Sequence, residues 1–239
     1  MKAIAVLPAA LLLALTGGML APAQARVRST TISWSGYTWV ARSAPGNPGA
    51  PQAWSPGNVS VDSAGRLHLK VTRDKHGHYA QAELDSTRNG WGYGTYRWQV
   101  ASDVSQQAPE YVLGLFTYGR DAAYGHREID IEASGWGTTP ITWDYTTWAN
   151  GQDSVARTPA PAGASTQQFV WQPGLLTWSS WDAAGNLIGT ATASGADVPV
   201  PYDESIGMNF WLCGCASGWN STPAAEVVIS GFSFTPYSG

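Results

Sequence analysis

Apolar and polar residues alternate with a period of two along most of this chain, in short runs that predict half-buried β-strands. The runs fall at residues 58–73 (two runs around a turn), 79–86, 94–102, 111–118, 127–133, 141–148, 167–172, 175–182, 186–193, 207–212 and 226–236. Turn signals separate them, notably at 62–65, 172–174 and 182–186. Many short strands without interleaved helical patterns predict an all-β fold, an antiparallel sandwich or jelly roll.

The run HREIDIEASGWG, at residues 126–137, carries the candidate chemistry. A strand would place Glu128, Asp130 and Glu132 on one face and the two intervening isoleucines on the other. Adjacent acids raise one another's pKa values, so at least one should hold a proton near neutral pH. A proton donor beside an ionised carboxylate is what glycosidic cleavage requires. The alternative is a half-buried strand with its acids in water, because alternation alone is common.

The lengths of the three side chains fit this chemistry. Positions 128 and 132 are separated by roughly 13 Å of strand, whereas retaining glycosidases hold two carboxyl groups about 5–5.5 Å apart. Two long glutamates leaning together on a concave strand would close that gap. Only a short side chain fits between them, and residue 130 is aspartate.

The N-terminus predicts where the protein works. Lys2 precedes an apolar stretch that is interrupted by Pro8 and ends in the small-residue site at 23–25. Residues 1–25 are therefore predicted to be a secretory signal peptide, and residues 26–239 a single domain. No later segment is apolar enough to cross a bilayer. We expect a secreted, extracellular monomer that is not bound to a membrane.

Composition narrows the expected partners. The formal net charge is −4, from 17 acidic and 13 basic residues. Nucleic acids and anionic membranes attract proteins with a basic surface, so neither is expected as a partner. This weakly negative net charge is compatible with binding of an uncharged polymer, and we expect a polysaccharide as the partner.

The HREIDIEASGWG run, preceded by YGTYRW and LGLFTY and followed by FVWQPGLLTW and MNFW, resembles glycoside hydrolase family 16. The similarity is greatest to the bacterial β-glucanases, the lichenase-like branch with an unbulged EIDIE strand, and it spans about residues 54–237. It implies a concanavalin-like jelly roll whose concave sheet forms a substrate cleft. It also implies that Glu128 is the nucleophile, that Glu132 is the general acid/base, and that Asp130 hydrogen-bonds and tunes Glu128.

The same resemblance suggests which residues bind sugar in the cleft. Glu83 in AELDS matches a glutamate that bonds sugar hydroxyls, and the other candidates are Phe116, Tyr118, Asn209, Trp211 and Trp219. Aromatic rings suit sugars because each combines an apolar face with a polar edge. Core packing is the usual alternative for such rings. Core or strand-surface packing is what we expect for Trp34, Trp39, Trp171, Trp178 and Trp181.

The chain departs from the family around the catalytic run. His126 stands where lichenase-like enzymes have a tryptophan, and alternation places it on the catalytic face; a solvated rim histidine is the alternative. Asp144 replaces a cleft asparagine, and Ala133-Ser134 replaces a phenylalanine-leucine pair. These changes leave the glycan and its linkage open. Ser230 stands where the family's structural calcium has an aspartate ligand, so we expect neither that site nor any cofactor.

Three activities are compatible with these features. We expect endo-acting hydrolysis of a β-linked polysaccharide, with a β-glucan as the expected substrate, by retaining double displacement. A transglycosylase would need the same three acids, with a sugar hydroxyl in place of water in the second step. A non-catalytic, lectin-like domain shares the sandwich, but it has no need of a proton donor beside a nucleophile. The sequence disfavours the binding domain and leaves hydrolysis and transfer unseparated.

Cys213 and Cys215 flank a single glycine beside the MNFW run. Two thiolates without further ligands are half a zinc site, whereas export favours a disulfide. An extended pair of this spacing lies near the upper limit of Cα separation, which a tight turn at Gly214 would relieve. A disulfide between residues two apart closes a very small ring, so it reduces the entropy of the unfolded chain only slightly. Its role would be to shape the cleft edge.

We predict that neither Cys213 nor Cys215 reacts with a maleimide in denaturant without reductant, because each is blocked by the other. Mass spectrometry should detect two labels once reductant is added. Full labelling of both residues without reductant would contradict the disulfide.

Overall fold

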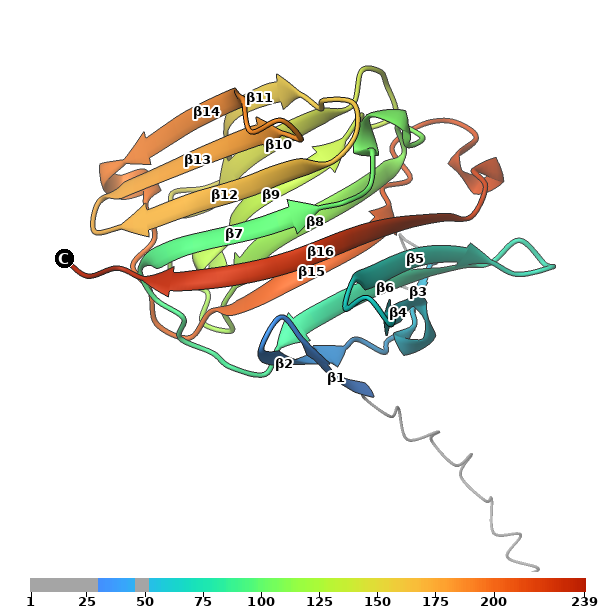
Figure 1. The fold of residues 1–239 in the computed structure, drawn as a ribbon, viewed down its shortest axis with the longest axis horizontal. Helices are drawn as coiled ribbons and strands as arrows, with labels where there is room; N and C mark the ends of the chain where they lie inside the picture. The colour runs from blue at the N-terminus through green and yellow to red at the C-terminus, as the bar shows by residue number, and fades with distance from the viewer. Residues whose placement is uncertain (1–29, 46–51) are drawn as a thin grey trace, which may run out of the picture.

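Two antiparallel sheets pack face to face in the computed structural model, which describes residues 30–45 and 52–239 (Figure 1). Sheet I has the strand order β11 (Asp153–Pro159), β10 (Thr142–Thr147), β9 (Ile129–Ser134), β8 (Tyr111–Tyr118), β15 (Ser205–Leu212) and β6 (Tyr79–Ser86), with β2 (Tyr37–Ala41) and β1 (Thr30–Trp34) beyond. Sheet II has the order β14 (Leu187–Ser194), β13 (Leu175–Asp182), β12 (Ser165–Gln172), β7 (Gly94–Val100), β16 (Ala225–Pro236), β5 (Leu67–Arg73) and β4 (Val59–Val61). The predicted all-β sandwich is confirmed.

The two sheets are joined at one edge, where the end of β5 pairs with the start of β6. There β3 (Ala53–Trp54) also pairs with β6, in parallel. The described residues contain five short 3-10 turns: Pro56–Asn58, Val104–Gln106, Gly125–Arg127, Gly195–Asp197 and Trp219–Ser221. None of the helical segments within residues 30–45 and 52–239 has the length and apolar character needed to cross a membrane. The predicted signal peptide, residues 1–25, lies outside the described residues.

The core lies between the sheets and follows the alternation of the sequence. On β8, Leu113 and Leu115 are fully buried between the sheets, while Phe116 and Tyr118 face outward into a cavity. The predicted core tryptophans Trp34, Trp39, Trp171 and Trp178 are buried. Trp181 is half-buried on sheet II under the guanidinium of Arg97, 5.0 Å from its ring centre. Both locations agree with the expected core or strand-surface packing.

Three hairpins close with the same Asp-x-x-Gly turn. In the first, Asp62 Oδ1 accepts the backbone N–H groups of residues 64 and 66, each at 2.9 Å, and the N–H of Gly65 donates to the Asp62 carbonyl at 3.0 Å. Gly65 has a φ of +77°, a conformation that glycine adopts without a steric cost. The same bonds recur at 74–78 and 182–186. These turns align β4 with β5, β5 with β6, and β13 with β14.

The structure differs from the predicted strands at the edges and before the catalytic run. β1, β2, β3 and β11 were not predicted. β11 ends in Pro159, which an edge strand tolerates because one of its sides needs no N–H donors. The strand predicted at 127–133 begins only at Ile129, because the residues at 124–127 all have positive φ.

The structure joins Cys213 to Cys215 in a disulfide just after β15. Their Cα atoms are 5.1 Å apart, and Gly214 between them has a φ of +62°. The glycine therefore makes the tight turn that brings the two cysteines within bonding range.

A charged cluster on sheet II links the turn before β5 to β16. His68 Nδ1 contacts a carboxylate oxygen of Glu226, and its Nε2 lies 3.1 Å from Asp62 Oδ2. Arg66 Nε donates to the same Asp62 oxygen at 2.8 Å. The hydrogen bond to Asp62 is the main cause that raises the pKa of His68, against partial burial, which lowers it; Glu226 adds to the rise.

We predict that His68 stabilises the fold in its charged form. Its pKa in the folded state lies above the ordinary 6.5, so the stabilisation is complete below that value and is lost as pH rises through the folded-state pKa. His68→Gln should therefore lower the free energy of unfolding in urea more at about pH 5.5 than at about pH 9. His78→Gln is the matched control, since His78 contacts Asp74 at 3.0 Å but its side chain is 78% exposed. Equal losses from His68→Gln at the two pH values would contradict the prediction.

Candidate active site

Two glycines flatten the outward face of sheet I. A Cβ on Gly207 of β15 would lie 2.2 Å from the ring of Phe116, and one on Gly114 of β8 would lie 2.5 Å from Asn209 Oδ1. The Phe116 ring therefore lies across Gly207, while Asn209 lies over Gly114 and accepts its backbone N–H at 3.1 Å. Side chains lie along this face instead of projecting from it, and the space above is left open for a ligand.

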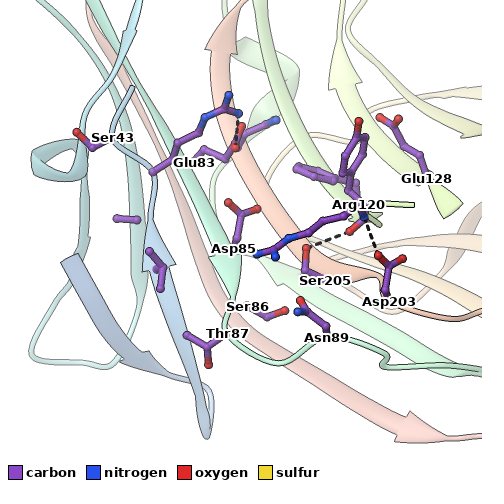
Figure 2. A pocket seen from close by; sticks show the side chains of 16 residues that line it. Ser43, Glu83, Asp85, Ser86, Thr87, Asn89, Arg120, Glu128, Asp203 and Ser205 are labelled. Atoms are coloured by element: carbon purple, nitrogen blue, oxygen red, sulfur yellow. Dashed lines mark hydrogen bonds and ion pairs between the residues drawn. The ribbon is translucent and has the colours of Figure 1, made fainter. Parts of the chain in front are cut away.

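Two cavities of about 940 and 570 Å³ lie over this face, and Glu128 lines both. The first cavity is lined by residues of β2, β6, β8 and β15 and of the loops beside them; Figure 2 shows Glu83, Asp85 and Ser205 there, with Glu128 on the opposite side. The second is lined by residues of β9, β10, β11 and β15 and of adjoining loops. Sites for a bound polymer are thus available on both sides of Glu128.

The three predicted catalytic acids lie together in the second cavity. Glu132 lies between Gly114 of β8 and Asp144 of β10, and Asp130 lies between Phe116 and Thr146. The isoleucines at 129 and 131 are fully buried in the core, as the alternation predicts. Trp178 crosses the core from sheet II and donates Nε1–H to the Asp130 carbonyl at 3.0 Å, which anchors the strand from behind.

Burial dominates the electrostatics of these acids. It raises the pKa of Glu128 to about 7. It also raises the pKa of Glu132 to about 7, with further contributions from the charges of Asp144 and Glu128. The pKa of Asp130 lies well above its usual value because of burial and its two glutamate neighbours, although Trp148 Nε1 donates to Asp130 Oδ2 at 2.9 Å. Near neutral pH, the set therefore contains both protonated and ionised carboxyl groups.

Asp144 is held in place by two hydrogen bonds and an ion pair, and it is 2% exposed. Trp136 Nε1 donates to it at 2.8 Å and Thr142 Oγ1 at 2.6 Å, and Arg157 Nε lies 3.2 Å from its carboxylate. Its charge faces Glu132 across the ladder. The predicted position of Asp144 beside the catalytic run thus matches the structure.

The first cavity contains four of the eight predicted substrate-binding residues. Its lining includes Glu83, Phe116, Tyr118 and Asn209, while Trp211 lines the second cavity. Glu83 accepts Arg42 NH1 at 2.6 Å. Asp85, two residues further along β6, has its pKa raised to about 7 by burial and by the charge of Glu83, against the pull of Arg42.

Two predicted cleft residues lie elsewhere. His126 is not on the strand, because its φ of +62° breaks the extended backbone; it stacks on Tyr118 with ring centres 4.8 Å apart and lines neither cavity. The alternation that placed it on the strand was therefore wrong. Its stacking on Tyr118, which lines the first cavity, puts His126 beside that cavity, where the alternative of a rim histidine would have it. Trp219 is half-buried in a 3-10 turn, 5.9 Å from the Tyr79 ring, and lines neither cavity. The disulfide turn after β15 separates it from the strand that carries Asn209 and Trp211.

Sequence reasoning missed Arg42, Asp85, Trp136, Trp148 and Arg157, all of which line the cavities. A signal was present for three of them. Asp85 lies in the predicted strand 79–86, on the same face as Glu83. Trp136 stands within the HREIDIEASGWG run, and Trp148 ends the predicted strand 141–148. The two arginines come from β11 and from the segment after β2, whose pairing with sheet I the sequence did not reveal.

Ser230, for which no role in a calcium site was expected, donates Oγ–H to the Gln99 carbonyl at 3.1 Å. Among residues 30–45 and 52–239, no group of three or more histidine, cysteine, aspartate or glutamate side chains could hold a metal ion.

Comparisons with known proteins agree with this geometry. No family model matches the chain. A curated β-glucanase of Paenibacillus macerans is 34% identical over 163 residues, which cover 66% of this chain and 64% of that protein, so the match spans less than two thirds of the relative's length. A β-1,3-1,4-glucanase (lichenase) from a mouse hindgut metagenome has a TM-score of 0.61 at 25% identity, covering 83% of this chain and 93% of the other.

The fold alone also matches a glycoside hydrolase family 16 endo-glucanase from Bacteroides ovatus, with a TM-score of 0.61 at 15% identity over 82% of this chain and 94% of the other. The chain is thus similar to a curated β-glucanase in sequence and to glycoside hydrolase family 16 enzymes in fold.

Proposed function

We propose that this protein is a secreted, endo-acting hydrolase of β-linked glucans that works by retaining double displacement. The observation that carries the proposal is the set Glu128, Asp130 and Glu132 on one cavity wall, with carboxyl pKa values raised toward or above neutrality. The β-glucanase name of the curated relative supports glucan as the substrate. Cavities on both sides of Glu128 support cleavage within a chain rather than at its end.

In the first step, Glu128 attacks the anomeric carbon while Glu132 protonates the leaving oxygen. This step needs Glu128 ionised and Glu132 protonated. The repulsion between them, added to the charge of Asp144 opposite Glu132, favours a shared proton on the Glu132 side. In the second step, Glu132 takes a proton from water, which releases the sugar with its original configuration.

Asp130 acts between the two glutamates. Its carboxyl group is buried, and Trp148 fixes one of its oxygens. The other oxygen is free to share a proton with a neighbouring glutamate, and through such a bond Asp130 would tune the basicity of Glu128. This role needs the carboxyl group but makes no bond to the sugar.

The cavity walls suit a neutral polymer. Phe116 and Tyr118 in the first cavity, and Trp136 and Trp211 in the second, offer ring faces for stacking on sugars. Glu83 and Asn209 offer polar atoms for hydroxyl groups. We propose that the protein acts on its polysaccharide as an exported monomer.

The function is tested by incubating the purified protein with β-glucans of mixed and single linkage, xyloglucan, galactans and chitin. We expect new reducing ends from a β-glucan, with products of intermediate length appearing first because cleavage is internal. Redistribution of chain lengths without new reducing ends would indicate a transglycosylase, and retention without turnover would indicate a binding domain. Either result would overturn the proposal.

The roles of the two glutamates are tested with azide. Glu128→Ala should give an α-glycosyl azide from an activated β-glycoside, because azide attacks the sugar directly. Glu132→Ala should give a β-glycosyl azide. The glycosyl-enzyme still forms in this variant, and azide then attacks its anomeric carbon and releases the Glu128 carboxylate. Asp130→Asn should keep partial activity. NMR of the products reads the configurations, and swapped configurations would reverse the two assignments.

A further inference from the structure

The backbone turns left-handed just before Glu128. The φ values of Tyr124, Gly125, His126 and Arg127 are 54°, 55°, 62° and 56°. Three of these residues carry side chains that clash in this conformation. Such a run persists only where surrounding contacts impose it, and it is characteristic of functional sites.

The Arg127 side chain supplies many of those contacts from a position that is 5% exposed. Its Nε donates to the Val200 carbonyl at 2.9 Å, and its NH1 to the carbonyls of Asp121 and Ala123 at 3.2 and 3.3 Å. The carboxylates of Asp121 and Asp203 lie 3.5 and 3.6 Å from the same nitrogen. One guanidinium thus ties the loop before the turn to the segment before β15.

The turn is also held on its other sides. The Arg127 carbonyl accepts Thr117 Oγ1 at 2.9 Å, and the His126 carbonyl accepts the N–H of Gly119 at 2.5 Å. A Cβ on Gly125 would lie 2.1 Å from the Trp148 carbonyl oxygen. The backbone at residue 125 therefore has no room to move toward β10.

Glu128 and Glu132 are supported differently. Glu132 lies within the ladder, paired with Gly114 and Asp144. Glu128 precedes β9, which pairs with its neighbours only from Ile129 onward. The backbone of Glu128 is fixed by its N–H to the Gly125 carbonyl and by Trp148 N–H to its own carbonyl, each at 3.2 Å. Its direction therefore depends on the turn.

We propose that Arg127 is a positioning residue for Glu128, holding the left-handed turn that aims this carboxyl group into the two cavities. The catalytic consequence rests on the proposed function, with Glu128 as the nucleophile. Loss of the guanidinium contacts lets the turn relax to ordinary right-handed or extended backbone, and Glu128 swings toward water. Glu132 keeps its place, because its ladder does not involve the turn.

Arg127→Lys tests this, since lysine keeps the charge but cannot make the forked set of bonds. Arg97→Lys is the matched control: Arg97 also donates to a side chain, Gln168 at 3.2 Å, and covers a tryptophan, but it lies on sheet II. The first measurement needs no substrate. Carboxyl ¹³C NMR follows the titration of Glu128, whose signal is assigned with Glu128→Gln. The charged and titratable groups around Glu128 are not substituted in either variant; they are Asp130, Glu132, Tyr118, Arg120 and Asp203.

In Arg127→Lys the pKa of Glu128 should fall from about 7 toward its ordinary 4.5, and in Arg97→Lys it should not move. The second measurement is turnover of an activated β-glycoside. We expect kcat to fall about 10–100-fold with KM within about twofold, because a displaced nucleophile slows the chemistry without removing sugar contacts. If Arg127→Lys does not fold, Asp121→Asn weakens the ion pair 3.5 Å from the guanidinium, and should shift the titration in the same direction by a smaller amount.

An unchanged Glu128 titration in a folded variant, or an unchanged kcat with only a lower melting temperature, would overturn the proposal. A shifted titration in a protein that cleaves no glycan would support the positioning role and overturn the proposed function instead.

Discussion

Removal of three neighbouring carboxyl groups from water is the constraint on which the rest of this structure depends. A carboxylate loses hydration when buried, and each adjacent negative charge adds repulsion. The protein offsets this with donors placed around the strand, Trp148 to Asp130 and Trp136 to Asp144. These donors do not fully offset the cost of burying the charged carboxylates. The remaining cost raises the pKa values of Glu128 and Glu132 to about 7, so that protons are held on these groups near neutral pH.

The sandwich makes this constraint tolerable by fixing the strand from both sides of the sheet. Behind it, Ile129 and Ile131 are buried in the core, and Trp178 reaches the Asp130 carbonyl from the opposite layer. In front, Gly114 and Gly207 leave room for Asn209 and Phe116 to lie flat. The close-packed core thus holds the acids from behind, and the flat face in front leaves space above them for the proposed substrate.

The two halves of the cleft differ in chemistry. The first cavity contains Arg42 with Glu83, and Asp85 beside them. The second contains a buried Asp144 under Arg157, among three tryptophans. Asp144 is a departure from the resembling enzymes, and its charge acts directly on the proposed acid/base. The departures thus lie where they would affect the proposed chemistry as well as the proposed recognition of a glycan.

The sequence by itself determined most strands, the sandwich, and the shared face of Glu128, Asp130 and Glu132, because alternation and turn signals are local properties of the chain. The assignment of Glu83 and Asn209 to the cleft came instead from the resemblance of short motifs to a known family. Tertiary structure alone decided which distant segments supply Arg42 and Arg157, since strand pairing across long sequence separations leaves no local signal. It also decided the positions of His126 and Trp219. A left-handed turn, imposed on residues 124–127 by contacts with segments as distant as Val200, breaks the alternation that periodicity assumes.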